Sequence, residues 1–353
     1  MTTQFSARAL KHLGYKTVII TPKSNSGENL KNEVKILGSN LRLRLLDKRL
    51  KIPLSIRYIV FQIILSILIR VEFRRENLVF WTRDSLIAIL LSIFSKSVVV
   101  LEIHRVPNYF YSFTIYIAKF KKNIVIAPIS FFLKEKLSLH DKRVIIAPMS
   151  VNKNDLIYFN KNKNRKTNKI IYVGSIHSSG IPLHLDLLNN SAKIISKSNP
   201  TWTIEIVGIS KADFLTSISE EISWNIKVIG YKKRADVLRS LSSASIALVV
   251  YPNDKYFQDS FPIKIIEYAS ASAAIVASKT ISHINILGHD KCMYFKPDSS
   301  ISLANSINTL IRNPKKRREI SSLARDWAKD FTYETRVLNI MNEVNNIKKG
   351  MYS

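Results

Sequence analysis

Cysteine is almost absent from this sequence, since Cys292 is the one cysteine among 353 residues. A single cysteine excludes an internal disulfide framework and fits a reducing compartment. The first 20 residues contain no apolar segment followed by a small-residue cleavage site, so they predict no signal peptide. The chain is 46% hydrophobic and 23% charged, which is a globular balance. At this length we expect two domains of ordinary size.

Acidic residues are scarce, because 26 Asp and Glu stand against 54 Lys and Arg and leave a formal net charge of +28. Such a charge attracts polyanions, and both nucleic acid and an anionic membrane are compatible with it. The excess is concentrated in the first 150 residues, which hold 25 basic and 9 acidic residues. The lysine-rich composition of an AT-rich genome explains part of this bias equally well, so charge alone does not choose a partner.

Long apolar runs are also missing, and the densest stretch lies in residues 52–73. Its apolar part, Tyr58–Ile69, is interrupted by Gln62 and Ser66. About 20 consecutive apolar residues are needed to cross a bilayer, so this stretch is too short. It predicts a helix that is either buried in the core or lies in a membrane interface, with flanking arginines near anionic headgroups.

Short apolar runs alternate with amphipathic stretches along the rest of the chain, which is typical of an α/β fold with parallel sheets. Residues 152–168 are polar and basic, and they predict a linker between two such α/β domains. We expect an N-terminal domain over 1–151 and a C-terminal domain over 169–330. A final helical segment over 331–353 follows.

Glycine is rare, with nine residues in the chain, yet three glycines end predicted strands of the second half. They are Gly174, Gly208 and Gly230, in the segments IIYVG, IEIVG and IKVIG. A glycine at this place lets the backbone approach a ligand or turn sharply into the next helix. Either explanation accounts for one glycine, and three in equivalent positions favour a site.

The most informative passage is Asp259–Ser278, DSFPIKIIEYASASAAIVAS. Pro262 suits the first position of a helix, with Ser260 as the capping side chain. The free N–H groups at such a helix start suit a diphosphate, and Lys264 lies in the first turn. Glu267, three residues later, can accept hydrogen bonds from ribose hydroxyls. By spacing alone, a surface Lys–Glu pair explains the same residues.

This passage resembles the donor-site signature Ser-Pro-x-Lys-x-x-Glu-Tyr of the retaining GT-B glycosyltransferases of family 4. Phe261 is inserted after Ser260, while Pro262, Lys264, Glu267 and Tyr268 fall in place. Several other segments are similar to that family in order and spacing, and the likeness is strongest over residues 169–335. These segments are Thr82–Asp84, Glu102–His104, Tyr172–Gly174, Ile206–Gly208, Val228–Pro252 and Trp327–Glu334.

The resemblance implies two Rossmann-like domains that face a central cleft, with a C-terminal helix that crosses back to the N-terminal domain. It implies transfer of a sugar, with retention of configuration, from a nucleotide sugar to a glycan or glycolipid acceptor in bacterial surface polysaccharide synthesis (lipopolysaccharide, O-antigen or capsule). The catalytic residues that it implies are His104, Asp259 and Glu267. The donor-binding residues that it implies are Gly174, His177, Gly208, Tyr231, Pro262, Ile263, Lys264 and Glu267.

The expected partners are a nucleotide sugar, a lipid-linked or oligosaccharide acceptor and an anionic membrane surface, without nucleic acid. The sequence contains no Asp-x-Asp motif, so we expect no metal, and no cofactor besides the donor substrate. The expected location is cytoplasmic, at the inner face of the plasma membrane.

Two departures from the family pattern leave alternatives open. The loop Gly174–Gly180 lacks the Arg and Lys that usually grip the donor diphosphate, so Lys264, the helix start or His177 must bind it instead. The chain also begins at the expected first helix, Thr3–Leu13, so the first strand of the N-terminal domain is either missing or upstream. A non-catalytic polyanion-binding protein and an enzyme that acts on the nucleotide sugar itself, such as an epimerase, are the other functions compatible with the sequence.

Overall fold

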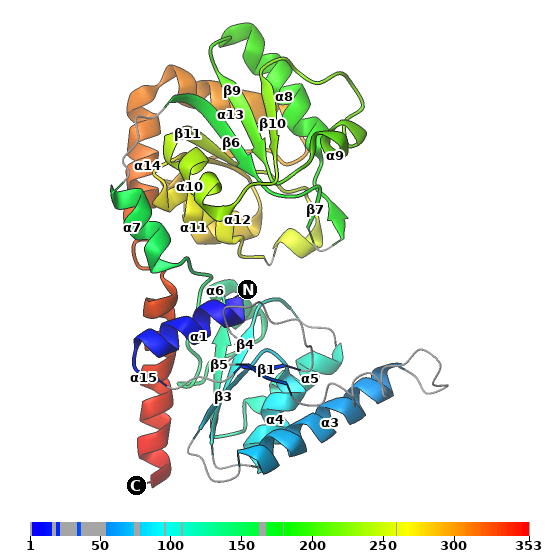
Figure 1. Ribbon diagram of the computed structural model, residues 1–353, viewed down its shortest axis with the longest axis vertical. Helices are drawn as coiled ribbons and strands as arrows, with labels where there is room; N and C mark the ends of the chain where they lie inside the picture. The colour runs from blue at the N-terminus through cyan, green and yellow to red at the C-terminus, as the bar shows by residue number, and fades with distance from the viewer. Residues whose placement is uncertain are drawn as a thin grey trace. The chain divides into compact units, whose positions relative to one another are not determined.

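The computed structural model describes residues 2–15, 19–21, 34–36, 54–73, 78–94, 97–106, 109–161, 167–178, 180–258 and 260–352 (Figure 1). The chain forms two compact units. The first unit comprises Met1–Pro148 together with Tyr333–Ser353, and the second unit comprises Met149–Thr332. The C-terminal segment therefore belongs to the first unit.

The second unit is built on a six-stranded parallel sheet in the order β10-β9-β6-β11-β12-β13. The strands are β6 (Thr167–Val173), β9 (Thr203–Val207), β10 (Ile226–Gly230), β11 (Ala244–Val249), β12 (Ala274–Ser278) and β13 (Cys292–Phe295). Chain order reverses between β6 and β11, as in a doubly wound Rossmann sheet. The carboxyl ends of β6 and β11 therefore mark the switch point where such sheets bind ligands.

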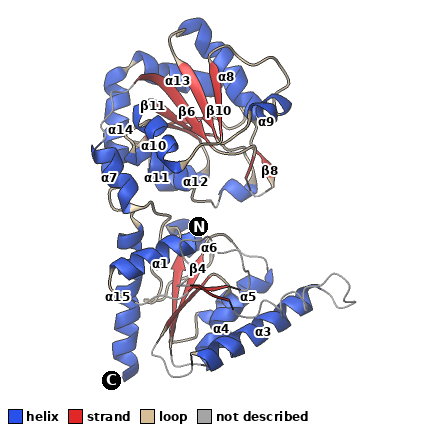
Figure 2. Ribbon diagram, in the orientation of Figure 1, coloured by secondary structure: helices blue, strands red, loops and turns tan. Residues whose placement is uncertain are grey.

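Helices cover both faces of this sheet (Figure 2). One face is packed by α10 (Arg234–Ser243), α11 (Ile263–Ser270) and α14 (Pro314–Ala328). The other is packed by α8 (Leu185–Ser198) and α13 (Ser300–Arg312). Shorter elements are β7 (His177–Ser178), β8 (Ile181–Pro182), α9 (Lys211–Thr216), α12 (Ile281–Leu287) and the 3₁₀ turn η2 (Lys255–Gln258). Every residue of β11 and β12 is buried, as expected for central parallel strands.

The segment expected to be a linker differs in the structure, because its residues Lys153–Lys161 form helix α7. Phe159 is buried, and Leu156 and Tyr158 pack against the same apolar cluster. The polar composition of the segment concealed these apolar residues, which lie on the packed side of the helix. Helix α7 is part of the second unit.

The first unit contains a parallel sheet in the order β3-β4-β5 and a separate parallel pair of β1 (Ile19–Thr21) and β2 (Val34–Ile36). The sheet strands are β3 (Val79–Thr82), β4 (Val98–Ile103) and β5 (Ile124–Pro128). Residues 143–147 run alongside β5, where Val144 forms an isolated bridge with Ile126 and the Ala147 N–H donates to the Pro128 carbonyl at 2.8 Å.

Helices again lie on both faces of the β3-β4-β5 sheet. Helices α3 (Leu54–Glu72), α4 (Ser85–Phe94) and α5 (Tyr109–Ala118) pack on one face. Helices α1 (Thr2–His12) and α15 (Tyr333–Tyr352) pack on the other, and α6 (Phe131–Lys136) follows β5. Among the residues that the structure describes, no helix is long and apolar enough to cross a membrane.

Candidate functional site

Three glycines meet at the carboxyl edge of the second unit's sheet, where Gly174 follows β6, Gly208 follows β9 and Gly230 ends β10. The Gly208 N–H donates to the Gly230 carbonyl at 2.9 Å, and the Gly174 N–H donates to the Val207 carbonyl at 3.0 Å. Gly208 has φ +92°, and a Cβ atom there would lie 2.4 Å from the Gly174 carbonyl oxygen. Glycine is therefore required at Gly208 by both backbone conformation and space.

Lys264 lies at the switch point of this sheet, in the first turn of α11. Its Nζ is 4.9 Å from the centre of the Tyr172 ring, on β6, and 5.2 Å from that of Tyr251, just after β11. Burial lowers the pKa of Lys264 to about 8, although the carboxylate of Glu267 opposes this change. The structure thus holds a partly desolvated ammonium group where a doubly wound sheet binds its ligand.

Helix α11 begins one residue later than the sequence predicts. Pro262 occupies the N-cap position with φ −71° and ψ 120°, and no side chain caps the helix. Ser260 does not serve as the cap, because its hydroxyl donates to the Phe257 carbonyl at 3.2 Å. Ile263 is the first residue of the helix. The predicted residue Asp259 lies outside the described residues.

Glu267 lies on α11, one turn beyond Lys264, and only 9% of the residue is exposed. Its Oε1 forms an ion pair at 2.7 Å with Nη2 of Arg234, the first residue of α10. The same nitrogen donates to Oδ2 of Asp155, on α7, at 2.6 Å. Glu267, which we predict to bind the ribose, is thus held by Arg234, a residue that the sequence did not indicate.

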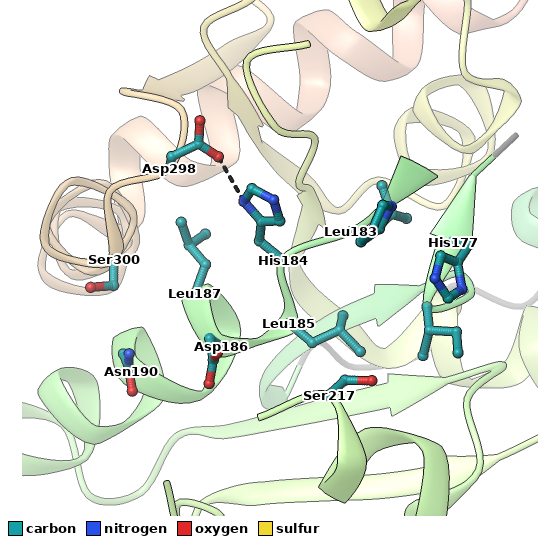
Figure 3. A pocket seen from close by; sticks show the side chains of 12 residues that line it. His177, Leu183, His184, Leu185, Asp186, Leu187, Asn190, Ser217, Asp298 and Ser300 are labelled. Atoms are coloured by element: carbon teal, nitrogen blue, oxygen red, sulfur yellow. Dashed lines mark hydrogen bonds and ion pairs between the residues drawn. The ribbon is translucent and has the colours of Figure 1, made fainter. Parts of the chain in front are cut away.

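The remaining predicted donor-site side chains of the second unit, those of Tyr231 and His177, are more exposed. Tyr231 directly follows Gly230 and is 74% exposed. His177 lies in the β7–β8 hairpin and lines a cavity of about 460 Å³ (Figure 3). His184 Nδ1 and Asp298 Oδ1 approach to 3.1 Å in the wall of this cavity. Its size is that of a small-ligand pocket.

His104 lies in the first unit, directly after the central strand β4. Its Nε2 is 2.9 Å from Oε2 of Glu102, which also receives the Nε–H of Arg83 at 3.0 Å. Burial raises the pKa of Glu102, but the hydrogen bond from His104 and the charge of Arg336, with further contributions from protonated His104 and from Arg83, outweigh burial and hold that pKa well below its usual range. An ionised carboxylate only accepts, so His104 Nε2 carries the proton.

Burial also lowers the pKa of His104, against the opposing effect of Glu102. The ring is therefore neutral at neutral pH, with its Nδ1 lone pair able to accept a hydrogen bond. The predicted catalytic histidine is thus an oriented hydrogen-bond acceptor.

Arg336 connects this histidine to the C-terminal helix α15. It is 3% exposed, and its Nη1 lies 2.6 Å from Oε1 of Glu102. Its Nε also donates to the Ala147 carbonyl at 3.2 Å. Sequence reasoning did not find Arg336, because the two partners are separated by 234 residues. Arg83 appeared only within the Thr82–Asp84 segment.

No cluster of three or more His, Cys, Asp or Glu side chains suited to a metal ion occurs within the described part of the chain. Charged groups at the candidate donor site include Lys264, Glu267, Arg234 and Asp155. Such a site can bind an anion and hydroxyl groups through protein side chains and the start of α11.

Residues 154–327 match the family described as Glycosyl transferases group 1. The chain resembles the glycosyltransferase from Rickettsia africae ESF-5 with a TM-score of 0.73 and 15% identity, over 99% of this chain and 94% of that one. It resembles the sucrose-phosphate synthase from Thermosynechococcus elongatus with a TM-score of 0.66 and 12% identity, over 99% and 93%. It also resembles Anabaena HepE, solved in complex with UDP, with a TM-score of 0.57 and 15% identity, over 82% of each chain. No curated protein sequence matches the chain.

The structural likenesses confirm the expected α/β fold of GT-B type, with Rossmann-like domains. The family match confirms the expected enzyme class, because residues 154–327 carry a glycosyltransferase domain. This range contains Lys264, Glu267 and the three glycines at the sheet edge.

Proposed function

We propose that this chain is a retaining glycosyltransferase of the family 4 type, which transfers a sugar from a nucleotide sugar to a glycan or glycolipid acceptor in bacterial surface polysaccharide synthesis. The observation that carries the proposal is the position of Lys264 and Glu267 on the first turns of α11, at the switch point of the sheet. A cation and a carboxylate there match the two chemical features of a nucleoside diphosphate, which are the anion and the ribose diol.

Each group of this site has one role in the proposal. The start of α11 and the ammonium group of Lys264 bind the diphosphate and stabilise the charge that develops as it leaves. Glu267 accepts hydrogen bonds from the ribose. Tyr231 stacks on the base, which its 74% exposure permits. His177 contributes to anion binding in the loop that lacks arginine and lysine.

During transfer, the bond between the anomeric carbon and the diphosphate oxygen breaks, and the diphosphate keeps the bonding electrons. The acceptor oxygen forms the new bond on the same face of the sugar, and its proton passes to the leaving diphosphate oxygen. His104 accepts a hydrogen bond from a hydroxyl of the donor sugar through its free Nδ1, and Glu102 fixes the ring. Asp259 contacts the transferred sugar.

The acceptor in this proposal is lipid-linked, and helix α3 supports a location at the inner face of the plasma membrane. Gln62 and Ser66 are buried on this helix, whereas Ile67 and Val71 are 45% and 68% exposed. The packed side of α3 also buries Phe61, Leu65 and Ile69, so this helix is apolar on both sides, whereas an ordinary surface helix has a polar outer face. The other large apolar residues that α3 and α5 expose are Ile56, Tyr58, Val60, Ile63, Leu68, Tyr109, Phe110, Phe113 and Tyr116.

Basic residues stand beside this apolar surface. Lys119 Nζ lies 5.5 Å from the centre of the Tyr116 ring, and the Arg70 side chain donates to the Phe94 carbonyl at 2.7 Å. An apolar surface with a basic border suits an anionic membrane. Flotation with phosphatidylglycerol vesicles should carry the protein, and phosphatidylcholine vesicles should carry much less. Equal flotation of wild type and an Ile67→Glu/Val71→Glu variant would exclude this surface.

The enzymatic proposal is tested with purified protein and radiolabelled UDP, GDP and ADP sugars. We expect one nucleotide class to stabilise the protein thermally and its sugar to be transferred or slowly hydrolysed. UDP is the first nucleotide to test, because HepE was solved with UDP. Absence of binding, transfer and hydrolysis with all three classes would refute the proposal.

A further inference from the structure

We propose that Arg234 is a positioning residue that holds the Glu267 carboxylate in the orientation that receives the donor ribose. This inference rests on the proposed function and adds to it the reason why Glu267 keeps one orientation. The two residues come from different helices, since Arg234 begins α10 and Glu267 lies on α11.

The two carboxylate oxygens of Glu267 have different surroundings. Its Oε1 is paired with Arg234 Nη2 at 2.7 Å. Within the described part of the chain, no hydrogen bond or ion pair engages its Oε2. The side chain is 11% exposed, so one carboxylate oxygen is anchored and the other stays available in a nearly closed site. A ribose hydroxyl that donates to Oε2 therefore finds an acceptor whose direction is already fixed.

Arg234 also separates two carboxylates. Its Nη2 lies 2.6 Å from Asp155 Oδ2 and 2.7 Å from Glu267 Oε1, so these two oxygens are at most 5.3 Å apart. Like charges at this distance repel, and each disfavours ionisation of the other. Without the guanidinium group, Glu267 would turn away from Asp155 or take up a proton. Either change removes an oriented acceptor from the ribose site.

The position of Arg234 in its helix argues against a role in helix stability. A cation in the first turn opposes the positive end of the helix dipole. The Arg234 side chain is also 47% exposed, so it contributes little apolar packing. The contribution of Arg234 to the structure therefore comes from its ion pairs with Asp155 and Glu267.

The experiment compares binding of UDP and 2′-deoxy-UDP by calorimetry, or the ADP or GDP pair if that nucleotide binds instead. Wild type should prefer the ribonucleotide by about 10-fold or more, as expected for a hydrogen bond to a charged group. Arg234→Gln should reduce this preference to about 3-fold or less, while binding of the deoxynucleotide changes little. Arg234→Lys, which keeps the charge, should retain an intermediate preference.

Arg239→Gln is the matched control. Arg239 lies on the same helix and forms an ion pair with Asp236 at 2.9 Å, and its side chain is 67% exposed. This variant should keep the wild-type preference and fold. A wild-type preference in Arg234→Gln would overturn the inference. Equal weakening of both nucleotides, with the preference intact, would also overturn it, because Arg234 would then contact a group common to both.

Failure of the proposed function has a different signature. If wild type binds no nucleoside diphosphate, or binds both forms equally, then Glu267 is not a ribose ligand and the inference about Arg234 falls with it. Glu267→Ala tests the ribose contact directly, because it removes the acceptor, so a preference that survives this substitution comes from another group.

Discussion

Lys264 should reduce the stability of the second unit, and replacing it with methionine should raise that stability. Its pKa of about 8, against 10.5 for an ordinary lysine, means that burial penalises the charged form. At about 1.4 kcal/mol per pH unit, this interval corresponds to roughly 3 kcal/mol. Attraction between the Lys264 ammonium group and the rings of Tyr172 and Tyr251 stabilises the folded state by about 0.5–1 kcal/mol for each ring. The desolvation penalty is larger than this attraction, so Lys264→Met should stabilise the unit at pH 7 by about 1–2 kcal/mol.

The destabilising effect of Lys264 depends on pH, because only the protonated amine carries the desolvation penalty. Between pH 8 and 10.5 the unfolded chain binds a proton at Lys264 that the folded chain has lost. The free energy of unfolding due to this group therefore rises with pH across that window. Below pH 8 the penalty is fully present, and above 10.5 it is absent. The stability difference between Lys264→Met and wild type should thus shrink as pH rises through this range.

Thermal unfolding followed by circular dichroism measures the difference, which should be about 2–8 °C at pH 7 for a unit of this size. Lys315→Met is the control, because Lys315 is an exposed lysine on α14. Calorimetry should show that Lys264→Met weakens UDP binding by about 10- to 100-fold, since a charge-assisted contact is lost. A Lys264→Met protein that is less stable than wild type at pH 7 would refute the reasoning.

Three further perturbations test other parts of the structure. Arg336→Met should destabilise the first unit by about 3 kcal/mol in thermal unfolding, because it leaves the buried Glu102 carboxylate without one partner. Adding Glu102→Gln to this variant should recover part of the lost stability. No recovery would mean that the two residues are not coupled. Because the pKa of Glu102 is lowered, its contribution to stability is present above its ordinary pKa of 4.5 and lost as pH falls further, so the cost of Arg336→Met should shrink in acid. Gly208→Ala should lower the melting temperature and abolish nucleotide binding, since φ is +92° and a Cβ would meet the Gly174 carbonyl; wild-type stability would disprove the close approach. Tyr231→Ala should leave the melting temperature unchanged and weaken nucleotide binding by about 1–3 kcal/mol, while unchanged binding would exclude stacking on the base.

The sequence alone predicted much of the second unit, because its signals are local. The apolar runs that end in Gly174, Gly208 and Gly230 form strands β6, β9 and β10, so each signal lies within a few residues of the feature that it predicts. The passage around Lys264 and Glu267 was singled out through its resemblance to a family signature, which is a local motif because its groups share one short helix. The predicted linker failed for a related reason, because Phe159 is a core residue inside a polar segment.

Only the tertiary structure decided which residues that are distant in the chain form ion pairs. Arg234 reaches Asp155 and Glu267 across 79 and 33 positions of the chain, and Arg336 reaches Glu102 across 234. Such pairs leave no periodic trace in a sequence, because a salt bridge needs only two groups at a suitable distance after folding. Local patterning therefore predicted strands of the second unit and the start of α11 to within one residue, whereas the packing of α7, α10 and α15 determined which arginine holds each carboxylate.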